Sequence, residues 1–242
     1  MKRVYTESEF YIQYLEGKIS MAESFRYTQE DKEWFECFVK SDEFSEALGI
    51  VWKYGAEGWY HFEVTHKKRE IVDKFASLVK GATSVKSLFR KAKGYTMWTC
   101  NISLNHPFLI KIKEMGWTPR TEQERVYPKG EFNHEVFIKT YILMRHEVGM
   151  MQEKTKKGIK NRARLRIHGS IDVLQHINQH LHEELNITLK RLQSDGKVTR
   201  AKILTYQSNR EIPDILKYVG AKAALEKFNS FELGYVENPE EN

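Results

Sequence analysis

Cationic side chains recur at every second position in one short stretch of the chain, with an apolar residue between neighbours. They are Arg162, Arg164, Arg166 and His168. Since successive side chains of a β-strand point to opposite faces, this spacing predicts a strand with one apolar and one cationic face. Cations spaced along a twisted strand suit the phosphates of a nucleic acid or the base edges in its major groove. The alternative is a strand face that is merely solvated, although such a face usually carries both signs of charge.

Other basic residues are predicted to extend the same surface. In the second half of the chain they are Lys190, Arg200 and Lys202 on later strands and Lys154, Lys156, Lys157 and Lys160 at a hairpin tip. The first half contributes Lys86, Arg90 and Lys91 from one hairpin. There, however, Glu63 lies among the outward residues of the neighbouring strand. We therefore expect double-stranded DNA as the partner, bound unequally by the two halves.

The overall charge agrees with a polyanionic partner. The 242 residues carry a net charge of +6, and the region from 133 to 208 holds fourteen lysines and arginines against seven acidic residues. A hydrophobic fraction of 40% without a long apolar stretch is typical of a globular protein outside the membrane. No basic and apolar leader opens the chain, so we expect an intracellular, cytoplasmic protein. Cys37 and Cys100 are expected to be buried thiols.

An internal repeat at a spacing of about 103 residues must position these side chains. Its matching segments are Trp34 to Glu43 with Phe137 to His146, Phe62 to Val64 with Leu165 to Ile167, Ile71 to Val79 with Val173 to Leu181, and Phe108 to Gly116 with Ile212 to Gly220. What is shared is the apolar pattern rather than identity. Four matches in the same order indicate a duplication.

Each copy reads as helix, hairpin, helix, hairpin, helix. The predicted ranges are helices at 31–42 and 134–146, first strands at 47–54 and 148–154, helices at 67–80 and 170–184, and hairpins at 84–91 with 95–102 and 187–193 with 198–206. Glycines at 116 and 220 are suited to end the closing helices. The fold class is therefore α/β (α+β), with two pseudo-symmetric αββαββα repeats, antiparallel sheets and one open face for each sheet.

The predicted organisation has five parts in one monomeric chain. These are an N-terminal extension at 1–27, a first repeat at 28–117, a linker at 118–132, a second repeat at 133–220 and a C-terminal tail at 221–242.

The first helix of each copy carries a family resemblance. The stretch from Phe137 to Val148 resembles the signature helix of the LAGLIDADG homing endonucleases, and the stretch from Trp34 to Phe44 resembles it with one residue missing. The strand from Phe62 to His66 and the one from Arg164 to Ser170 are similar to the second strand of that family. The resemblance covers roughly residues 28–220 and lies in the pattern, since both signature motifs are degenerate. It implies paired sheets that form a saddle over DNA.

The resemblance also implies where a cleavage site would lie. In the family each signature helix ends in an acid that binds a divalent metal beside the scissile phosphate. Carried over, the first acid falls on Asp42, a tentative metal ligand, whereas the second falls on Arg145, which cannot bind Mg²⁺. Glu147, two residues further on, is the candidate substitute. A rival register with the stretch from Leu48 to Gly55 as the first signature helix puts Tyr54 at the acid; we reject it because it leaves no room for the first strand.

Three functions follow from these residues. The leading one is a double-stranded DNA-binding protein derived from a homing endonuclease whose cleavage is lost or impaired, with a regulatory, maturase-like or interference role. The first alternative is an active Mg²⁺-dependent site-specific endonuclease that uses Asp42 and Glu147. The second is an adaptor that binds an acidic protein partner. RNA in place of DNA stays open, and no membrane partner is expected.

Overall fold

The computed structural model describes residues 28–91, 94–119, 124–156, 158–194 and 202–235. Within these ranges no helix is long and apolar enough to cross a membrane. The first unit consists of α3 (Asp42–Tyr54), β1 (Gly55–Glu57), β2 (His61–His66), α4 (Arg69–Leu78), β3 (Lys86–Arg90), β4 (Tyr95–Ser103) and α5 (Pro107–Glu114). An additional helix, α2 (Gln29–Phe38), precedes it. The order is αββαββα, as predicted.

The second unit repeats this order. It consists of α6 (His134–Met144), β5 (His146–Thr155), β6 (Gly158–Gly169), α7 (Ile171–Leu185), β7 (Gln193–Ser194), β8 (Lys202–Tyr206) and α8 (Glu211–Tyr218). Two further elements follow in the predicted tail, α9 (Lys222–Asn229) and β9 (Gly234–Tyr235). The tail therefore contains a helix that the sequence pattern did not predict.

The two sheets have the same topology. Their strand orders are β1-β2-β4-β3 and β5-β6-β8-β7, all neighbours are antiparallel, and β9 pairs with β6. Helix α4 packs on β2 and β4, and α7 packs on β6 and β8. The alternate residues under these helices, such as Val64 and Leu165, are fully buried. One face of each sheet is thus covered by helices and the other is open, which confirms the predicted fold class.

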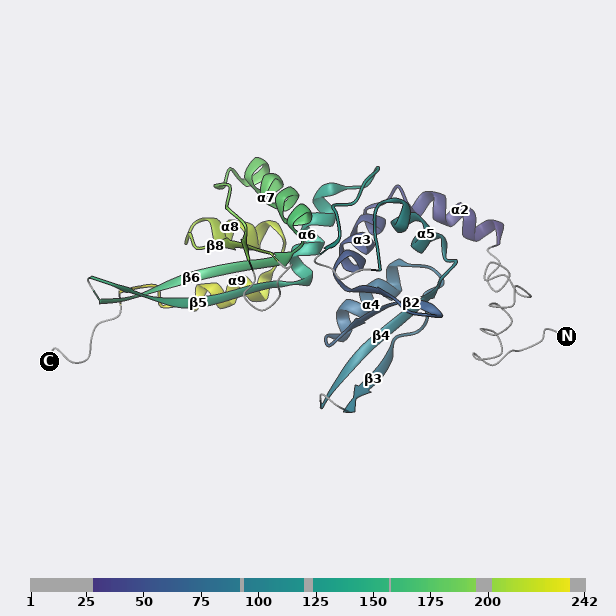
Figure 1. Ribbon diagram of the computed structural model, residues 1–242, viewed down its shortest axis with the longest axis horizontal. Coiled ribbons are helices and arrows are strands. Elements are labelled where there is room, and N and C mark those ends of the chain that lie inside the picture. Colours follow the sequence, from purple (N-terminus) through teal and green to yellow (C-terminus); the bar gives the residue numbers. More distant parts are fainter. Residues whose placement is uncertain (1–27, 92–93, 120–123, 157, 195–201, 236–242) are drawn as a thin grey trace.

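The units meet through α3 and α6, which lie side by side at the centre of the molecule (Figure 1). At their closest approach, a Cβ added to Gly49 would lie 2.7 Å from Cβ of Thr140. Glycine costs helix stability relative to alanine, but only glycine lets the two backbones come this near. Gly49 and Thr140 are each the third residue of the segments 47–55 and 138–146, so the two helices can be matched residue by residue from this contact.

This contact corrects the predicted register of the first unit. The range 47–54, predicted as a strand, is helical and belongs to α3. Helix α2, which overlaps the predicted signature helix, instead packs its aromatic residues against the first unit's own core, with Phe38 edge-on to Phe44 at 5.5 Å. In Figure 1, α3 lies between α2 and α6. The rival register placed its helix on this segment, and the reason given for rejecting it, a first strand at 47–54, was wrong.

Helix α2 also carries one of the two cysteines. Cys100 is buried, as expected, whereas Cys37 is exposed on this helix. The prediction of a buried thiol was wrong for Cys37, because α2 lies at the edge of the first unit and only part of its surface packs on the core.

The cause of the register error is a difference in hairpin length. In the first unit Gly55 pairs with Val64, nine residues later, whereas in the second His146 pairs with Ile167, twenty-one residues later. The second hairpin is therefore twelve residues longer, which lengthens each of its strands by about 20 Å, and it projects far from the body of the sheet (Figure 1). The repeat spacing of about 103 residues was read from the second strands, which follow the extra hairpin residues. It does not hold for the helices α3 and α6, which precede the hairpins.

Candidate nucleic-acid interface

The arginines of β6 lie on the open face of the second sheet. Opposite Arg162, Arg164 and Arg166, strand β5 places Met151, Gly149 and Glu147. All three arginines are half-buried, whereas Ala163, Leu165 and Ile167 between them are fully buried on the helix side. The predicted division of this strand into an apolar and a cationic face is confirmed.

The same face also carries acidic residues, contrary to the prediction of a single sign. Glu147 Oε2 lies 3.0 Å from a guanidinium nitrogen of Arg166, and Glu153 Oε2 lies 2.8 Å from Nε of Arg162. Both acids come from β5, the neighbouring strand, so the alternation within β6 did not reveal them. Each of the four side chains is between 31% and 48% exposed to solvent. Ion pairs between such partly exposed groups contribute little stability. A phosphate can compete for either arginine.

Arg164 lies between these two ion pairs. Its partner in the register is Gly149, and no heavy atom lies within 4 Å of the position that a Cβ on residue 149 would take. No salt bridge to Arg164 is present among the described residues. The missing side chain leaves the guanidinium reachable from solvent, at the middle of the open face.

Three other predicted residues do not add to the exposed cations of this face: Lys202 and Lys190 lie on the helix side of the sheet, and His168 is buried. Lys202 pairs with Gly169, on the helix side with Leu204 and Tyr206, and its Nζ lies 2.9 Å from Ser194 Oγ. His168 is buried, with Nε2 3.5 Å from Oε1 of Glu147. The predicted place of both residues on the exposed cationic face was therefore wrong: the sheet register puts Lys202 on the helix side, and His168 is buried although it follows the alternation of the arginines.

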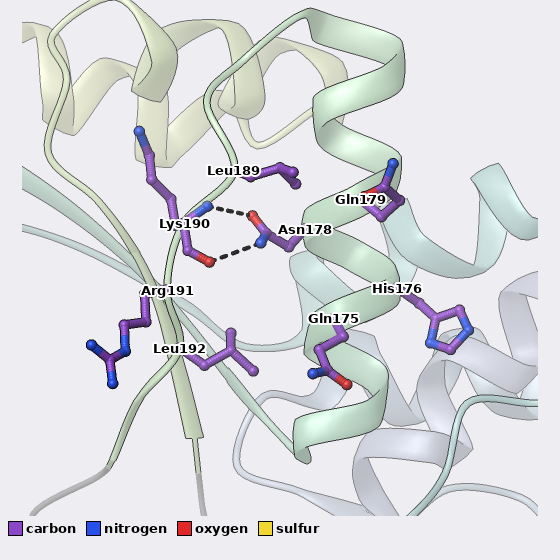
Figure 2. Close-up of a pocket in the computed structure, with 8 residues that line it drawn as sticks. All are labelled: Gln175, His176, Asn178, Gln179, Leu189, Lys190, Arg191 and Leu192. Carbon is purple, nitrogen blue, oxygen red and sulfur yellow. Dashed lines mark hydrogen bonds between the residues drawn. The ribbon is translucent and has the colours of Figure 1, made fainter.

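Lys190 also belongs to the helix layer. Its backbone N–H and C=O are held by Asn178 of α7, at 3.1 and 2.9 Å, beside a pocket of about 720 Å³ (Figure 2). Its Nζ lies 2.7 Å from Glu211 of α8. Lys190 thus lies with α7 and α8 and not on the open face where it was predicted.

The remaining predicted cations are placed as follows. Lys154 and Lys156 are exposed near the tip of the β5–β6 hairpin, and Lys86, Arg90 and Lys91 are exposed at the edge of the first sheet. Lys157 and Arg200 lie outside the described residues. Lys86 and Arg90 pair with Thr99 and Tyr95 and so share the open face with Thr65, whose hydroxyl donates to that of Thr99 at 3.0 Å. The first open face is thus more polar and less charged than the second.

The central helices end in residues other than acids. With Gly49 matched to Thr140, Tyr54 corresponds to Arg145. The Tyr54 hydroxyl donates to the carbonyl of Met144 at 2.6 Å, and its ring lies 4.6 Å from that of His66. The hydrogen bond to Met144 joins the end of α3 to the end of α6.

Asp42 lies at the opposite end of α3 from this junction. It is the first residue of the helix, and its Oδ1 accepts a hydrogen bond from Asn133 Nδ2 at 2.8 Å. Thirteen residues of helix separate the two ends, about 18 Å at 1.5 Å per residue. Asp42 and Glu147 therefore cannot share a metal ion, because they belong to opposite ends of the helix pair.

The side chains at the junction do not fit Mg²⁺. This ion requires carboxylate or other oxygen ligands in an octahedral arrangement, and a phenol and a guanidinium stand at the two helix ends. Among the described residues, no group of three or more histidine, cysteine, aspartate or glutamate side chains is placed to hold a metal. Glu147, the nearest acid to Arg145 along the chain, is already bound to Arg166.

A buried lysine reinforces the joint between the units. Lys53, only 4% exposed, directs its Nζ to the carbonyl of His168 and lies 3.4 Å from the hydroxyl of Tyr141, with the Tyr141 ring beneath it at 4.5 Å. Its charge is thus stabilised by the second unit, through a carbonyl and the face of an aromatic ring. These contacts of Lys53 help to fix the orientation of one open face relative to the other.

Comparison with known proteins agrees with this architecture. No family model matches the chain, and no curated protein does. Among solved structures, the LAGLIDADG meganuclease I-AabMI bound to uncleaved DNA is 10% identical with a TM-score of 0.51, covering 78% of this chain and 89% of that one. Meganuclease I-SmaMI bound to uncleavable DNA is 12% identical, with a TM-score of 0.50 and coverage of 77% and 88%. A double mutant of I-SmaMI is 11% identical, with a TM-score of 0.53 and the same coverage. The chain is thus a two-unit protein with the fold of the LAGLIDADG homing endonucleases.

Proposed function

We propose that this protein binds double-stranded DNA on the open faces of its two sheets and does not cut it. The observation that carries the proposal is the row of three arginines on the open face of β6, with Arg164 reachable beside Gly149. The meganucleases I-AabMI and I-SmaMI were crystallised with DNA, which supports a duplex as the partner for this fold. The longer β5–β6 hairpin, with Lys154 and Lys156 exposed near its tip, favours a footprint that reaches further on the side of the second unit.

The ends of α3 and α6 support the loss of cleavage. Two-metal cleavage depends on carboxylates that hold metal ions beside the scissile phosphate. Tyr54 and Arg145 stand at the corresponding positions, and Arg145 would repel a metal ion rather than bind it. A positive side chain there favours a phosphate without activating water, so binding and cutting are separated.

Target selection from a random duplex library, with and without Mg²⁺, tests this function. We expect an enriched sequence to be bound equally in both conditions and to remain uncut. The logarithm of the binding constant should fall steeply with that of the salt concentration, at about 0.9 for each phosphate neutralised. Mg²⁺-dependent cleavage would establish the active nuclease instead. Absence of salt-sensitive duplex binding would leave an RNA or an acidic protein as the partner.

Glu147→Gln separates the proposed function from the active nuclease. Removing this negative charge frees Arg166, which its carboxylate binds at 3.0 Å, and removes repulsion of the phosphates. We expect duplex affinity to rise about two- to fivefold, because a half-exposed ion pair contributes up to about 1 kcal/mol. If Glu147 held a metal, the same change would instead abolish cleavage. Glu114→Gln, on α5 and paired with Lys111, is the matched control and should change neither property.

A further inference from the structure

The segment that joins the two units holds a buried arginine against the end of the first central helix. Arg125 is only 3% exposed, and its guanidinium donates to three backbone carbonyls of the first unit. Nη1 lies 3.0 Å from the carbonyl oxygen of Val51 and 2.7 Å from that of Trp52, and Nη2 lies 2.6 Å from that of Gly55. Most carbonyls in the last turn of a helix lack a partner within it, and a positive charge is favourable there. Arg125 thus caps the end of α3.

Two buried indoles keep the guanidinium in this place. The ring of Trp117 lies 4.8 Å from the guanidinium carbon of Arg125, and its Nε1 donates to the carbonyl of Val51 at 3.2 Å. In the opposite direction, Nε1 of Trp52 on α3 donates to the carbonyl of Val126 in the linker at 2.8 Å. The linker and the last turn of α3 therefore each donate hydrogen bonds to the backbone of the other, which fixes one against the other.

The same turn of α3 carries the side chains that reach the second unit. Lys53 and Tyr54, which bond to carbonyls of the second unit, lie in sequence between two of the carbonyls that Arg125 binds. A turn whose carbonyls are held by a planar set of donors has little freedom to rotate or slide. Both side chains therefore leave it in one direction, so Arg125 acts on the joint between the units through the backbone that it holds.

Beyond this arginine, the linker follows α3 and is also attached to the second unit. The backbone N–H of Tyr127 donates to Oδ2 of Asp172, in the first turn of α7, at 2.6 Å. The backbone N–H of Asn133 donates to Oγ of Ser45, near the start of α3, at 2.8 Å. The described part of the linker thus runs from the last turn of α3 to its first and is bound to α7 on the way. It is a fixed strap between the units, not a flexible tether.

We propose that Arg125 is a positioning residue for DNA binding: by holding the last turn of α3 against the linker, it fixes the spacing that the protein accepts between the two halves of its target. This rests on the proposed function, because spacing matters only when one duplex lies on both open faces. Each base pair added between the halves rotates one of them by about 35° and moves it by about 3.4 Å. A rigid joint discriminates strongly between such duplexes, whereas a joint that can turn accepts several. Arg125 acts without touching DNA, since it is buried.

Arg125→Lys tests this role without changing the net charge. A lysine has one ammonium group and lacks the planar fork of donors that binds three carbonyls at once. The probes are the selected duplex and the same duplex with two base pairs inserted at its centre. We expect wild type to bind the lengthened duplex about a hundredfold more weakly, because its halves no longer fit both faces together. In Arg125→Lys this ratio should fall to about tenfold or less. The salt slope on the selected duplex should stay at the wild-type value, because no phosphate contact is removed.

A second pair of variants separates positioning from stability. Ile215→Ala is the matched control: it removes a buried side chain of α8, away from α3, and should lower the unfolding temperature while keeping the wild-type ratio between the two duplexes. Thermal unfolding shows which variants are folded. If Arg125→Lys is not, Trp52→Phe takes its place, because it removes the bond to the Val126 carbonyl and keeps a buried aromatic ring. It should reduce the ratio in the same direction.

The outcomes distinguish this inference from the function beneath it. A wild-type protein without salt-sensitive duplex binding defeats the proposed function itself. Salt-sensitive binding with the same ratio in wild type and in the folded variant overturns the role of Arg125 alone. So does a wild type that binds both duplexes equally well, since no spacing is then fixed. An equal fall of the ratio in Ile215→Ala would assign the effect to lost stability and would overturn the role as well.

Discussion

Gly49→Ala is expected to destabilise the protein by about 2 kcal/mol or more, although alanine is the better helix former by about 1 kcal/mol. The new Cβ would lie 2.7 Å from Cβ and 2.8 Å from Cγ2 of Thr140, and 3.1 Å from the carbonyl of Phe137. Neither helix can retreat easily, because Lys53 and Tyr54 bind α3 to the second unit at its end. Urea unfolding at equilibrium measures the decrease in the free energy of unfolding.

Two further variants make the test specific to the contact between α3 and α6. Gly149→Ala makes the same chemical change where no atom lies within 4 Å, so it should leave stability nearly unchanged. Thr140→Gly should recover part of the stability when combined with Gly49→Ala, giving a favourable coupling energy in a double-mutant cycle. If Gly49→Ala stabilised the chain as propensity alone predicts, α3 would not be the helix that contacts α6.

Arg164→Ala with Arg166→Ala is expected to weaken duplex binding about ten- to thirtyfold at physiological salt. The estimate assumes that each arginine neutralises one phosphate, which contributes about 0.9 to the salt slope. Both arginines share the open face of β6, and the space beside Arg164 is unfilled. The salt slope should therefore fall by nearly two, which fluorescence anisotropy over a salt series measures.

The control removes two arginines from the helix side. Arg69→Ala with Arg210→Ala changes a residue of α4 and the one before α8, and it should leave affinity close to wild type. Equally weakened binding in both variants would mean that only the net charge matters. Unchanged affinity in the Arg164 and Arg166 variant would remove the open face of the second sheet from the interface.

Much of the fold was predictable because the core residues alternate with short periods. Phe62 and Val64 alternate in β2 as Leu165 and Ile167 do in β6, and both pairs are buried as predicted. Amphipathic spacing likewise predicted α4 and α7, whose buried residues match between the units. These patterns are local, so a single sequence suffices to detect them.

The candidate site was less predictable because it depends on which segments meet. Asp42 has the residue type of a metal ligand, yet it begins a helix whose other end reaches the junction. Glu147 and Glu153 reach Arg166 and Arg162 only through the register of β5 on β6. Arg125 is an ordinary linker residue in sequence, and it binds the last turn of α3 only because the linker packs along that helix.

The amino-acid sequence by itself determined the duplication, the αββαββα order and the cationic spacing of β6, because periodicity and turn residues act over a few positions. Only the tertiary structure decided that Gly49 and Thr140 form the contact at the centre and that Tyr54 and Arg145 end the paired helices. The physical reason is twofold. A hairpin twelve residues longer in the second unit makes the repeat spacing of the helices differ from that of the strands. Close packing of two helix backbones also requires a residue without a side chain at the crossing, and Gly49 of α3 meets this requirement.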